Sequence, residues 1–291
     1  MNSPTISAAS CSAARSRHEA DHADGVDAPV KRLSHSRLAL LLDRFAPPLA
    51  FISLILAWEA VARLFAIPSF LLPAPSAILQ ALLATPLPVW LGHIWATLRV
   101  ALMGYALAIL VSVPLAVSLA SSRLLSRTLY PMLVVVQSTP IVAVAPIIVV
   151  TLGASDLPRV VITFLIAFFP IVVSTVTGLL ATPDELVELS RSLRAGRPRE
   201  ILHVRLPFAL PYLFSALKIS TTLAVVGAVV AEFVAAEKGL GFFIAFSTSF
   251  FKIPQAFAGL VVLVAISLML FRLVGLAQKV FAPWSLPKSE R

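Results

Sequence analysis

A histidine pair near the N-terminus has the spacing of a zinc site. His18, Glu19 and His22 match the pattern His-Glu-x-x-His, in which both histidines bind zinc and the glutamate acts as a general base. A catalytic zinc also needs a third protein ligand and an open position. The flanking residues are polar, offer no third ligand and have no periodic apolar face. We interpret the match as a coincidence in a solvated tail, with adventitious metal binding as the alternative, and expect neither a metal site nor a catalytic residue.

A polar island at residues 182–207 carries the densest basic cluster of the chain, between two strongly apolar segments. Its arginines are Arg191, Arg194, Arg197, Arg199 and Arg205. Leu186, Leu189 and Leu193 recur at helical spacing and form one apolar stripe. Because this stripe is too small to form a core alone, the pattern indicates a surface that binds a partner protein.

Local signals predict a helix, a tight turn and a second short helix within the island. Thr182 can act as N-cap, Pro183 suits the first helical position, and Glu185 completes a capping box. Gly196 followed by Pro198 indicates a stop and a new start. The elements that position the basic and apolar side chains are therefore two short helices joined near Gly196.

The island resembles the EAA loop of permease subunits in bacterial ATP-binding-cassette importers. The pattern of that loop is Glu-Ala-Ala, three residues, Gly, nine residues, Ile, one residue, Leu-Pro. Glu188-Leu189-Ser190 takes the first triplet, and Val204 and Leu206-Pro207 fall at the required spacing. Two departures stand out. Both alanines are replaced, and Arg194 stands at the glycine position with Gly196 two places later, so the turn is expected to be displaced.

The resemblance extends from about Trp58 to Trp284. Four short pieces, in order, are similar to permeases for sulfonate, nitrate, taurine and thiamine-precursor pyrimidines: Trp58-Glu59, Phe70-Leu71-Leu72-Pro73-Ala74-Pro75-Ser76, Gln137-Ser138-Thr139-Pro140 and Ala167-Phe168-Phe169-Pro170-Ile171-Val172-Val173. The family implies a cytoplasmic dimer of ATP-binding subunits and a periplasmic solute-binding protein as partners. It also implies the residues that couple to the ATPase: Glu185, Leu186, Glu188, Leu189, Leu193, Arg194 and Gly196.

Composition places the chain among polytopic membrane proteins. Of its 291 residues, 59% are hydrophobic and only 13% are charged, whereas about 25% are charged in soluble domains. The formal charge of +9 does not indicate a nucleic-acid binder, because the basic residues lie between apolar spans and not on a soluble face. Cys11 is the only cysteine, which excludes an intramolecular disulfide, and the polar residues before it argue against a lipoprotein anchor.

We predict an all-α polytopic membrane protein with about six transmembrane helices, because roughly 20 apolar residues cross a bilayer. The expected domains are a disordered cytoplasmic tail at 1–44, a permease domain at 45–284 and a cytoplasmic tail at 285–291. The expected spans cover residues 46–66, 98–120, 130–152, 158–181, 208–230 and 256–277. An interfacial helix is expected around Trp90–Trp95, a helical segment near 77–84, and an aromatic-rich segment, such as a short helix on the membrane, between 239 and 254.

Charge asymmetry orients these spans. With both termini in the cytoplasm of a bacterium, the inner side receives the island, the basic tail residues, Arg123 and Arg127, and the C-terminal Lys279, Lys288 and Arg291. The outer side receives little more than Arg159, Lys238 and Lys252, with Arg63 and Arg99 near span ends. This distribution obeys the positive-inside rule for the inner membrane and puts the island where ATP is.

Several polar residues fall inside the expected spans. Gln137, Ser138 and Thr139 precede Pro140 and either line a translocation path or bond one helix to another. Lys218, with Thr221 one turn later, is a further candidate for the path, because a charge at mid-bilayer costs about 2.5–3.5 kcal/mol. Lys218 can snorkel to the inner interface, which we favour, or meet an anion.

Glu59 and Arg63, four residues apart near the end of the first span, suit a local ion pair better than a gate.

These patterns lead to a transport function. The chain has no phosphate-binding Gly-x-x-x-x-Gly-Lys-Ser/Thr loop, so we expect it to bind no cofactor, with ATP and Mg used by the partner subunit. The resemblance implies an importer for a small anion such as a sulfonate, taurine or nitrate, or for a thiamine-precursor pyrimidine, built on a permease homodimer. An ion-coupled secondary transporter would need mid-membrane carboxylates and repeated halves, and a membrane enzyme would need a cluster of His, Asp or Glu at one depth.

Overall fold

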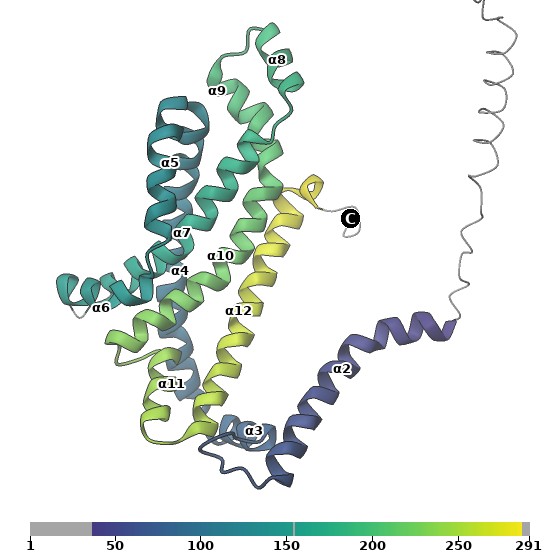
Figure 1. The fold of residues 1–291 in the computed structure, drawn as a ribbon, viewed down its shortest axis with the longest axis vertical. Helices are drawn as coiled ribbons and strands as arrows, with labels where there is room; N and C mark the ends of the chain where they lie inside the picture. The colour runs from purple at the N-terminus through teal and green to yellow at the C-terminus, as the bar shows by residue number, and fades with distance from the viewer. Residues whose placement is uncertain (1–36, 154, 287–291) are drawn as a thin grey trace, which may run out of the picture. The chain divides into compact units, whose positions relative to one another are not determined.

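The computed structural model describes residues 37–153 and 155–286, and this part of the chain is helical without any strand, as predicted (Figure 1). His18, Glu19, His22 and Cys11 lie outside the described residues. The chain divides into two units at residue 56. Helix α2 (Arg37–Leu64) contributes to both, and the second unit contains all later elements.

The second unit is a bundle of long helices joined by shorter ones. The long helices are α4 (Leu87–Ser121), α7 (Asp156–Leu180), α10 (Leu206–Ala235) and α12 (Ile253–Phe281). The shorter elements are α3 (Pro75–Ala84), α5 (Arg123–Gln137), α6 (Ile141–Leu152), α8 (Asp184–Ser192), α9 (Arg197–Glu200), η1 (Ile201–Arg205), α11 (Leu240–Ser249) and η2 (Pro283–Ser285). Five helical segments in the described residues are long and apolar enough to cross a membrane, or six if α5 and α6 form one bent span.

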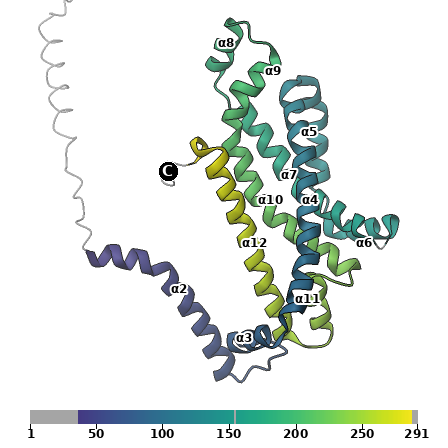
Figure 2. The same ribbon diagram turned by 180° about the vertical axis from the view of Figure 1, so that it is seen from behind.

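Helices α4, α7 and α10 pack along one another and form the core (Figures 1 and 2). Close approach depends on small residues. A Cβ added at Gly104 of α4 would lie 2.5 Å from the Cβ of Thr163, and one at Gly227 of α10 would lie 2.9 Å from the Cα of Thr163. Two glycines therefore let α4 and α10 contact the same residue of α7, which is the usual way in which membrane helices pack closely.

Helix α4 differs from its prediction. A separate interfacial helix around Trp90 followed by a span from residue 98 was expected, but α4 runs unbroken for 35 residues from Leu87. Trp90 is buried, donates from its indole nitrogen to the Leu82 carbonyl at 3.1 Å and packs on Phe243. The indole N–H thus has a hydrogen-bond acceptor within the protein. Trp90 therefore does not depend on the lipid headgroup region, where the prediction had placed it.

The segment expected as one span at residues 130–152 is divided into α5 and α6, which meet at 92°. Helix α5 ends at Gln137, and Pro140 is the N-cap of α6. The ring of Pro140 has no N–H to continue the ladder of α5, so the chain changes direction there. Pro131 and Pro146, by contrast, lie inside α5 and α6.

Glu59 and Arg63 form the expected ion pair, with Arg63 Nε 2.5 Å from Glu59 Oε1. The same carboxylate also accepts from the Ser76 amide at 2.9 Å and the Ser76 hydroxyl at 2.8 Å. Helix α3 has no capping side chain of its own, so Glu59 satisfies an N-terminal amide of α3 from 17 residues away. The pair fixes the connection between α2 and α3.

Candidate functional site: the 182–207 loop

The 182–207 loop stands at one end of the second unit, beyond the ends of α7 and α10 (Figure 1). It contains α8, a turn, α9 and the single π-helical turn η1, which continues directly into α10. The predicted helix-turn-helix is thus present. Leu206 donates its amide to the Ile201 carbonyl, five residues back, so no loop separates the second short helix from the span that follows. Motion of α9 therefore passes to α10 through continuous helix.

The helix start differs in detail from the predicted capping box. Pro183 is the N-cap of α8, without a side-chain capping bond. The Thr182 hydroxyl donates instead to the Leu179 carbonyl at 3.2 Å. Thr182 therefore closes the end of α7 and does not open α8, because it lies one residue too early to reach the free amides of α8.

The turn after α8 stays where the EAA pattern has its glycine. Arg194 has φ +54°, in the left-handed region, whereas Gly196 has φ −66°. The Arg194 amide donates to the Arg191 carbonyl at 2.9 Å, and the Ala195 amide to the Ser190 carbonyl at 3.0 Å. These are the two bonds of a Schellman motif, whose left-handed position is normally glycine. The expected displacement to Gly196 is wrong, and Arg194 adopts the glycine conformation itself.

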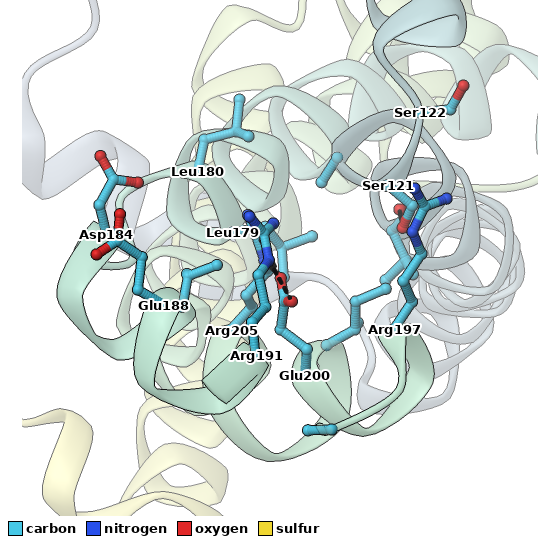
Figure 3. A pocket seen from close by; sticks show the side chains of 15 residues that line it. Ser121, Ser122, Leu179, Leu180, Asp184, Glu188, Arg191, Arg197, Glu200 and Arg205 are labelled. Carbon is cyan, nitrogen blue, oxygen red and sulfur yellow. Dashed lines mark hydrogen bonds and ion pairs between the residues drawn. The ribbon is translucent and has the colours of Figure 1, made fainter. Parts of the chain in front are cut away.

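Glu200 holds the loop together. It is buried and accepts from Arg205 Nε at 2.8 Å and from Arg191 Nε at 3.3 Å (Figure 3). Burial acts to raise the pKa of Glu200, but the hydrogen bond and charge of Arg205, followed by those of Arg191, outweigh it and lower this pKa. The ionised carboxylate thus joins α8 to the start of α10 through α9. Sequence analysis missed Glu200, although it is the only acidic residue between Arg191 and Arg205.

The apolar stripe of α8 lies on the surface as predicted. Leu189 is 56% exposed and Leu193 is 75% exposed. With Leu186, Arg199, His203 and Val204 they line a groove of about 440 Å³. Val187, on another side of α8, is buried and anchors the helix. The exposed leucines give the groove an apolar wall, so the groove suits an apolar ridge of another protein.

A second, larger hollow of about 840 Å³ separates the loop from the ends of α4 and α7 (Figure 3). Asp184 and Glu188 lie on one side of it, and Arg197, Ser121 and Ser122 line the other side. Glu188, the first residue of the EAA-like triplet, thus lines this polar cleft while the leucines line the apolar groove. The remaining expected coupling residues, Glu185 and Gly196, are exposed.

The predicted path residues lie in two places. Gln137, Ser138 and Thr139 are exposed at the bend between α5 and α6. Thr221 is buried and donates to the Leu217 carbonyl at 2.7 Å, and Lys218 is half-buried in α10. Among the described residues, no hydrogen bond or ion pair joins the bend to α10 at these positions.

Two charged residues within the long helices were missed or misplaced by sequence analysis. Arg272 lies in α12, nine residues before its end, and was overlooked because the surrounding run is so apolar. The fifth span was expected to end at residue 230, but α10 continues to Ala235 and includes Glu232, which is 2% exposed. Its Oε2 accepts from the Gly241 amide at 2.7 Å.

Comparison with known proteins agrees with this architecture. Residues 108–285 match the family described as "Binding-protein-dependent transport system inner membrane component". The chain is 37% identical over 241 residues to the riboflavin transport system permease protein RibX of Chloroflexus aurantiacus, covering 81% of this chain and 89% of RibX. It is 32% identical over 238 residues to the formylaminopyrimidine transport permease protein ThiX of Halalkalibacterium halodurans, covering 82% and 95%.

Two further similarities are more distant. The taurine transport system permease protein TauC of Escherichia coli is 26% identical over 238 residues, covering 79% of this chain and 86% of TauC. Among solved structures, a chain of the MetNI methionine ABC transporter in an inward-facing conformation superposes with a TM-score of 0.57 at 24% identity, over 70% of this chain and 100% of that chain. This last similarity supports the fold alone.

Proposed function

The chain belongs to the family of binding-protein-dependent transport system inner membrane components, as an ABC transporter permease, and we propose that it imports a small anion. The proposed solutes are a sulfonate, taurine or nitrate. The permease crosses the membrane several times, and ATP is hydrolysed by a separate subunit dimer in the cytoplasm. A periplasmic binding protein delivers the solute, and two copies of the permease enclose the path.

The observation that carries the coupling role is the groove of Leu186, Leu189 and Leu193 on a loop continuous with α10. In the proposed mechanism this groove receives an apolar ridge of the ATPase. Glu200 with its two arginines makes the loop a rigid lever, so closure of the ATPase dimer tilts α10 and the helices packed on it. Coupling requires that the loop contact the ATPase differently in the two states.

The names of the relatives specify different solutes, so they do not select one solute for this chain. The name of TauC specifies taurine, which carries a sulfonate, while the names of ThiX and RibX specify a formylaminopyrimidine and riboflavin. The cationic Lys218 inside a span favours the anion. A formylaminopyrimidine remains the alternative substrate class.

The test is ATPase activity in proteoliposomes that contain the permease, its co-encoded ATPase and its binding protein. Taurine, another alkanesulfonate or nitrate should stimulate hydrolysis, and Glu188→Lys or Leu193→Asp should abolish stimulation while the protein still inserts. Glu237→Lys, an exposed charge reversal outside the loop, is the matched control and should leave stimulation unchanged.

Each outcome bears on one part of the proposal. Stimulation by a pyrimidine, with no response to any anion, would replace the proposed solute class and keep the coupling role. Stimulation that survives Glu188→Lys and Leu193→Asp would contradict the assignment of the loop. Failure of the ATPase to co-purify with the wild-type permease would reopen the secondary-transporter alternative.

A further inference from the structure

Among the described residues, Lys218 and Arg272 are cationic side chains well inside the long helices of the second unit; Arg99 lies equally deep in α4 but is paired with Asp156. Lys218 lies twelve residues into α10, about 18 Å along its axis. Arg272 lies nine residues before the end of α12, about 14 Å from it. Since α10 begins and α12 ends on the side of the 182–207 loop, both charges lie in the halves of these helices that are next to that loop (Figure 1).

Neither cation has an anionic partner within the described residues. Five ion pairs occur there, and none of them includes Lys218 or Arg272. An unpaired charge inside a span costs about 2.5–3.5 kcal/mol for each residue. Charged residues in spans therefore usually mark a ligand or ion route, or reach the interface by snorkelling.

The Lys218 side chain lies at the seam between α10 and α12, which lie side by side in both views (Figures 1 and 2), whereas Arg272 is exposed beside it on α12. The Cε of Lys218 is 3.6 Å from the position that a Cβ on Gly275 would occupy. The aliphatic stem of Lys218 thus crosses onto α12 over a residue without a side chain. Arg272 precedes Gly275 by three residues, which is nearly one turn and about 4.5 Å along the axis.

We propose that Lys218 and Arg272 form an oxyanion site at the seam of α10 and α12, which takes a sulfonate or phosphate group. Gly275 leaves the space for the Lys218 stem, and each cation supplies N–H donors to a different side of the anion. The group has two sources, an anionic lipid in the adjacent leaflet or the imported solute on its way to the loop side. Only the second source rests on the function proposed above.

The experiment uses the permease–ATPase complex and two probes. In the first arm, native mass spectrometry measures retention of added phosphatidylglycerol. In the second, proteoliposomes with the binding protein give the taurine concentration for half-maximal ATPase stimulation. The variants are Lys218→Gln and Arg272→Gln. Lys252→Gln, which removes one charge at the opposite end of α12, is the matched control.

If the site exists, Lys218→Gln and Arg272→Gln should each weaken lipid retention or the response to taurine tenfold or more. Lys252→Gln should change neither measurement. Loss of phosphatidylglycerol retention identifies a lipid phosphate, and a raised taurine requirement identifies the solute. If no anion stimulates the ATPase but lipid retention still depends on both residues, the solute proposal fails and the site stands. If Lys218→Gln and Arg272→Gln match the control in both arms, the site is overturned.

Two glycine variants separate the site from a folding defect. Gly275→Ala makes only an ordinary contact with Lys218 and should behave as wild type. Gly275→Leu fills the seam without changing any charge and should reproduce the tenfold loss in a complex that elutes and melts normally. Wild-type behaviour of a well-folded Gly275→Leu complex in both arms would contradict the position of the site.

Discussion

At the residue scale, the 182–207 loop holds one residue, Arg194, in a strained backbone conformation. Arg194 takes the left-handed position of a Schellman motif, where a side chain costs about 1–2 kcal/mol relative to glycine. Gly196, which has the residue type for such a turn, has an ordinary φ of −66°. The turn is therefore fixed by the two backbone hydrogen bonds after α8 and not by the position of the glycine.

Arg194→Gly should stabilise the loop by about 1 kcal/mol, because it removes this strain and keeps both backbone bonds. Gly196→Ala is the matched control and should be nearly neutral, since a Cβ there meets nothing closer than 3.9 Å. Trypsin cleavage after Arg191, a site that both variants keep, measures local opening of the loop on the purified permease. Slower cleavage after Arg191 in Arg194→Gly than in Gly196→Ala is expected. Faster cleavage in Arg194→Gly would show that the left-handed conformation is not intrinsic to the turn.

The two arginines on Glu200 should contribute unequally. The side chain of Arg205 is 18% exposed and that of Arg191 is 64% exposed. Removing one partner of a buried pair costs about 3–5 kcal/mol, whereas an exposed pair contributes about 0–1 kcal/mol.

Arg205→Ala should therefore loosen the loop strongly and Arg191→Ala weakly, in hydrogen exchange of the α8 amides. Equal effects of the two substitutions would show that Arg191 holds Glu200 as strongly as Arg205 does, contrary to this prediction.

At the element scale, helix α11 is held by side chains from other helices. Its N-terminal amides at Gly239, Leu240 and Gly241 donate to His93 Nδ1, Thr97 Oγ1 and Glu232 Oε2 at 3.2, 2.8 and 2.7 Å. No capping side chain comes from the segment itself. The start of α11 is thus fixed across α4 and α10, at the end of the second unit opposite the 182–207 loop (Figure 1).

Gly239→Ala should disrupt this arrangement. Gly239 has φ +131°, and an added Cβ would lie 2.3 Å from the carboxyl carbon of Glu232. The buried carboxylate has to move, which leaves the Gly241 amide unsatisfied at a cost of about 1–3 kcal/mol beyond the backbone strain. A clear fall in the thermal unfolding midpoint in detergent is expected. Gly92→Ala, where a Cβ meets nothing within 4 Å, should raise the midpoint slightly or leave it unchanged.

The elements also show what sequence alone could predict. Long apolar runs located the membrane-crossing helices, because crossing a bilayer imposes length and composition directly. Pro140 interrupts the hydrogen-bond ladder after α5, but the size of the resulting bend, 92°, was not predicted from the sequence. The unbroken α4 was missed because Trp90 resembled an interfacial residue until Phe243, 153 positions later, was seen to pack on it.

The candidate site also combines features that the sequence predicts with features that it does not. The leucine stripe follows from helical period and was predicted. The role of Glu200 follows from three residues that meet only after the turn forms. The turn was predicted near Gly196 because glycine is the usual residue type in such a turn. In the structure, the backbone hydrogen bonds after α8 place the turn at Arg194 instead.

At the scale of the whole molecule, the charge distribution predicts which end faces the cytoplasm. Five arginines lie in the 182–207 loop. The opposite end carries Lys238 and Lys252, together with Arg99 and Arg159, whose charges are partly neutralised by Asp156. By the positive-inside rule the loop end should face the cytoplasm. The alternative orientation would put the apolar groove of the loop outside the cell, away from any ATPase.

Cys11 is the only cysteine, so replacing it with serine gives a background for testing this orientation with single cysteines. Leu189→Cys in the loop groove and Glu237→Cys at the opposite end are both exposed positions. A membrane-impermeant maleimide added to intact spheroplasts should label Glu237→Cys and leave Leu189→Cys unlabelled until the membrane is permeabilised. Labelling of Leu189→Cys in intact spheroplasts would place the loop outside, and the importer mechanism built on it would have to be abandoned, because the leucine groove could no longer reach ATP-driven machinery in the cytoplasm.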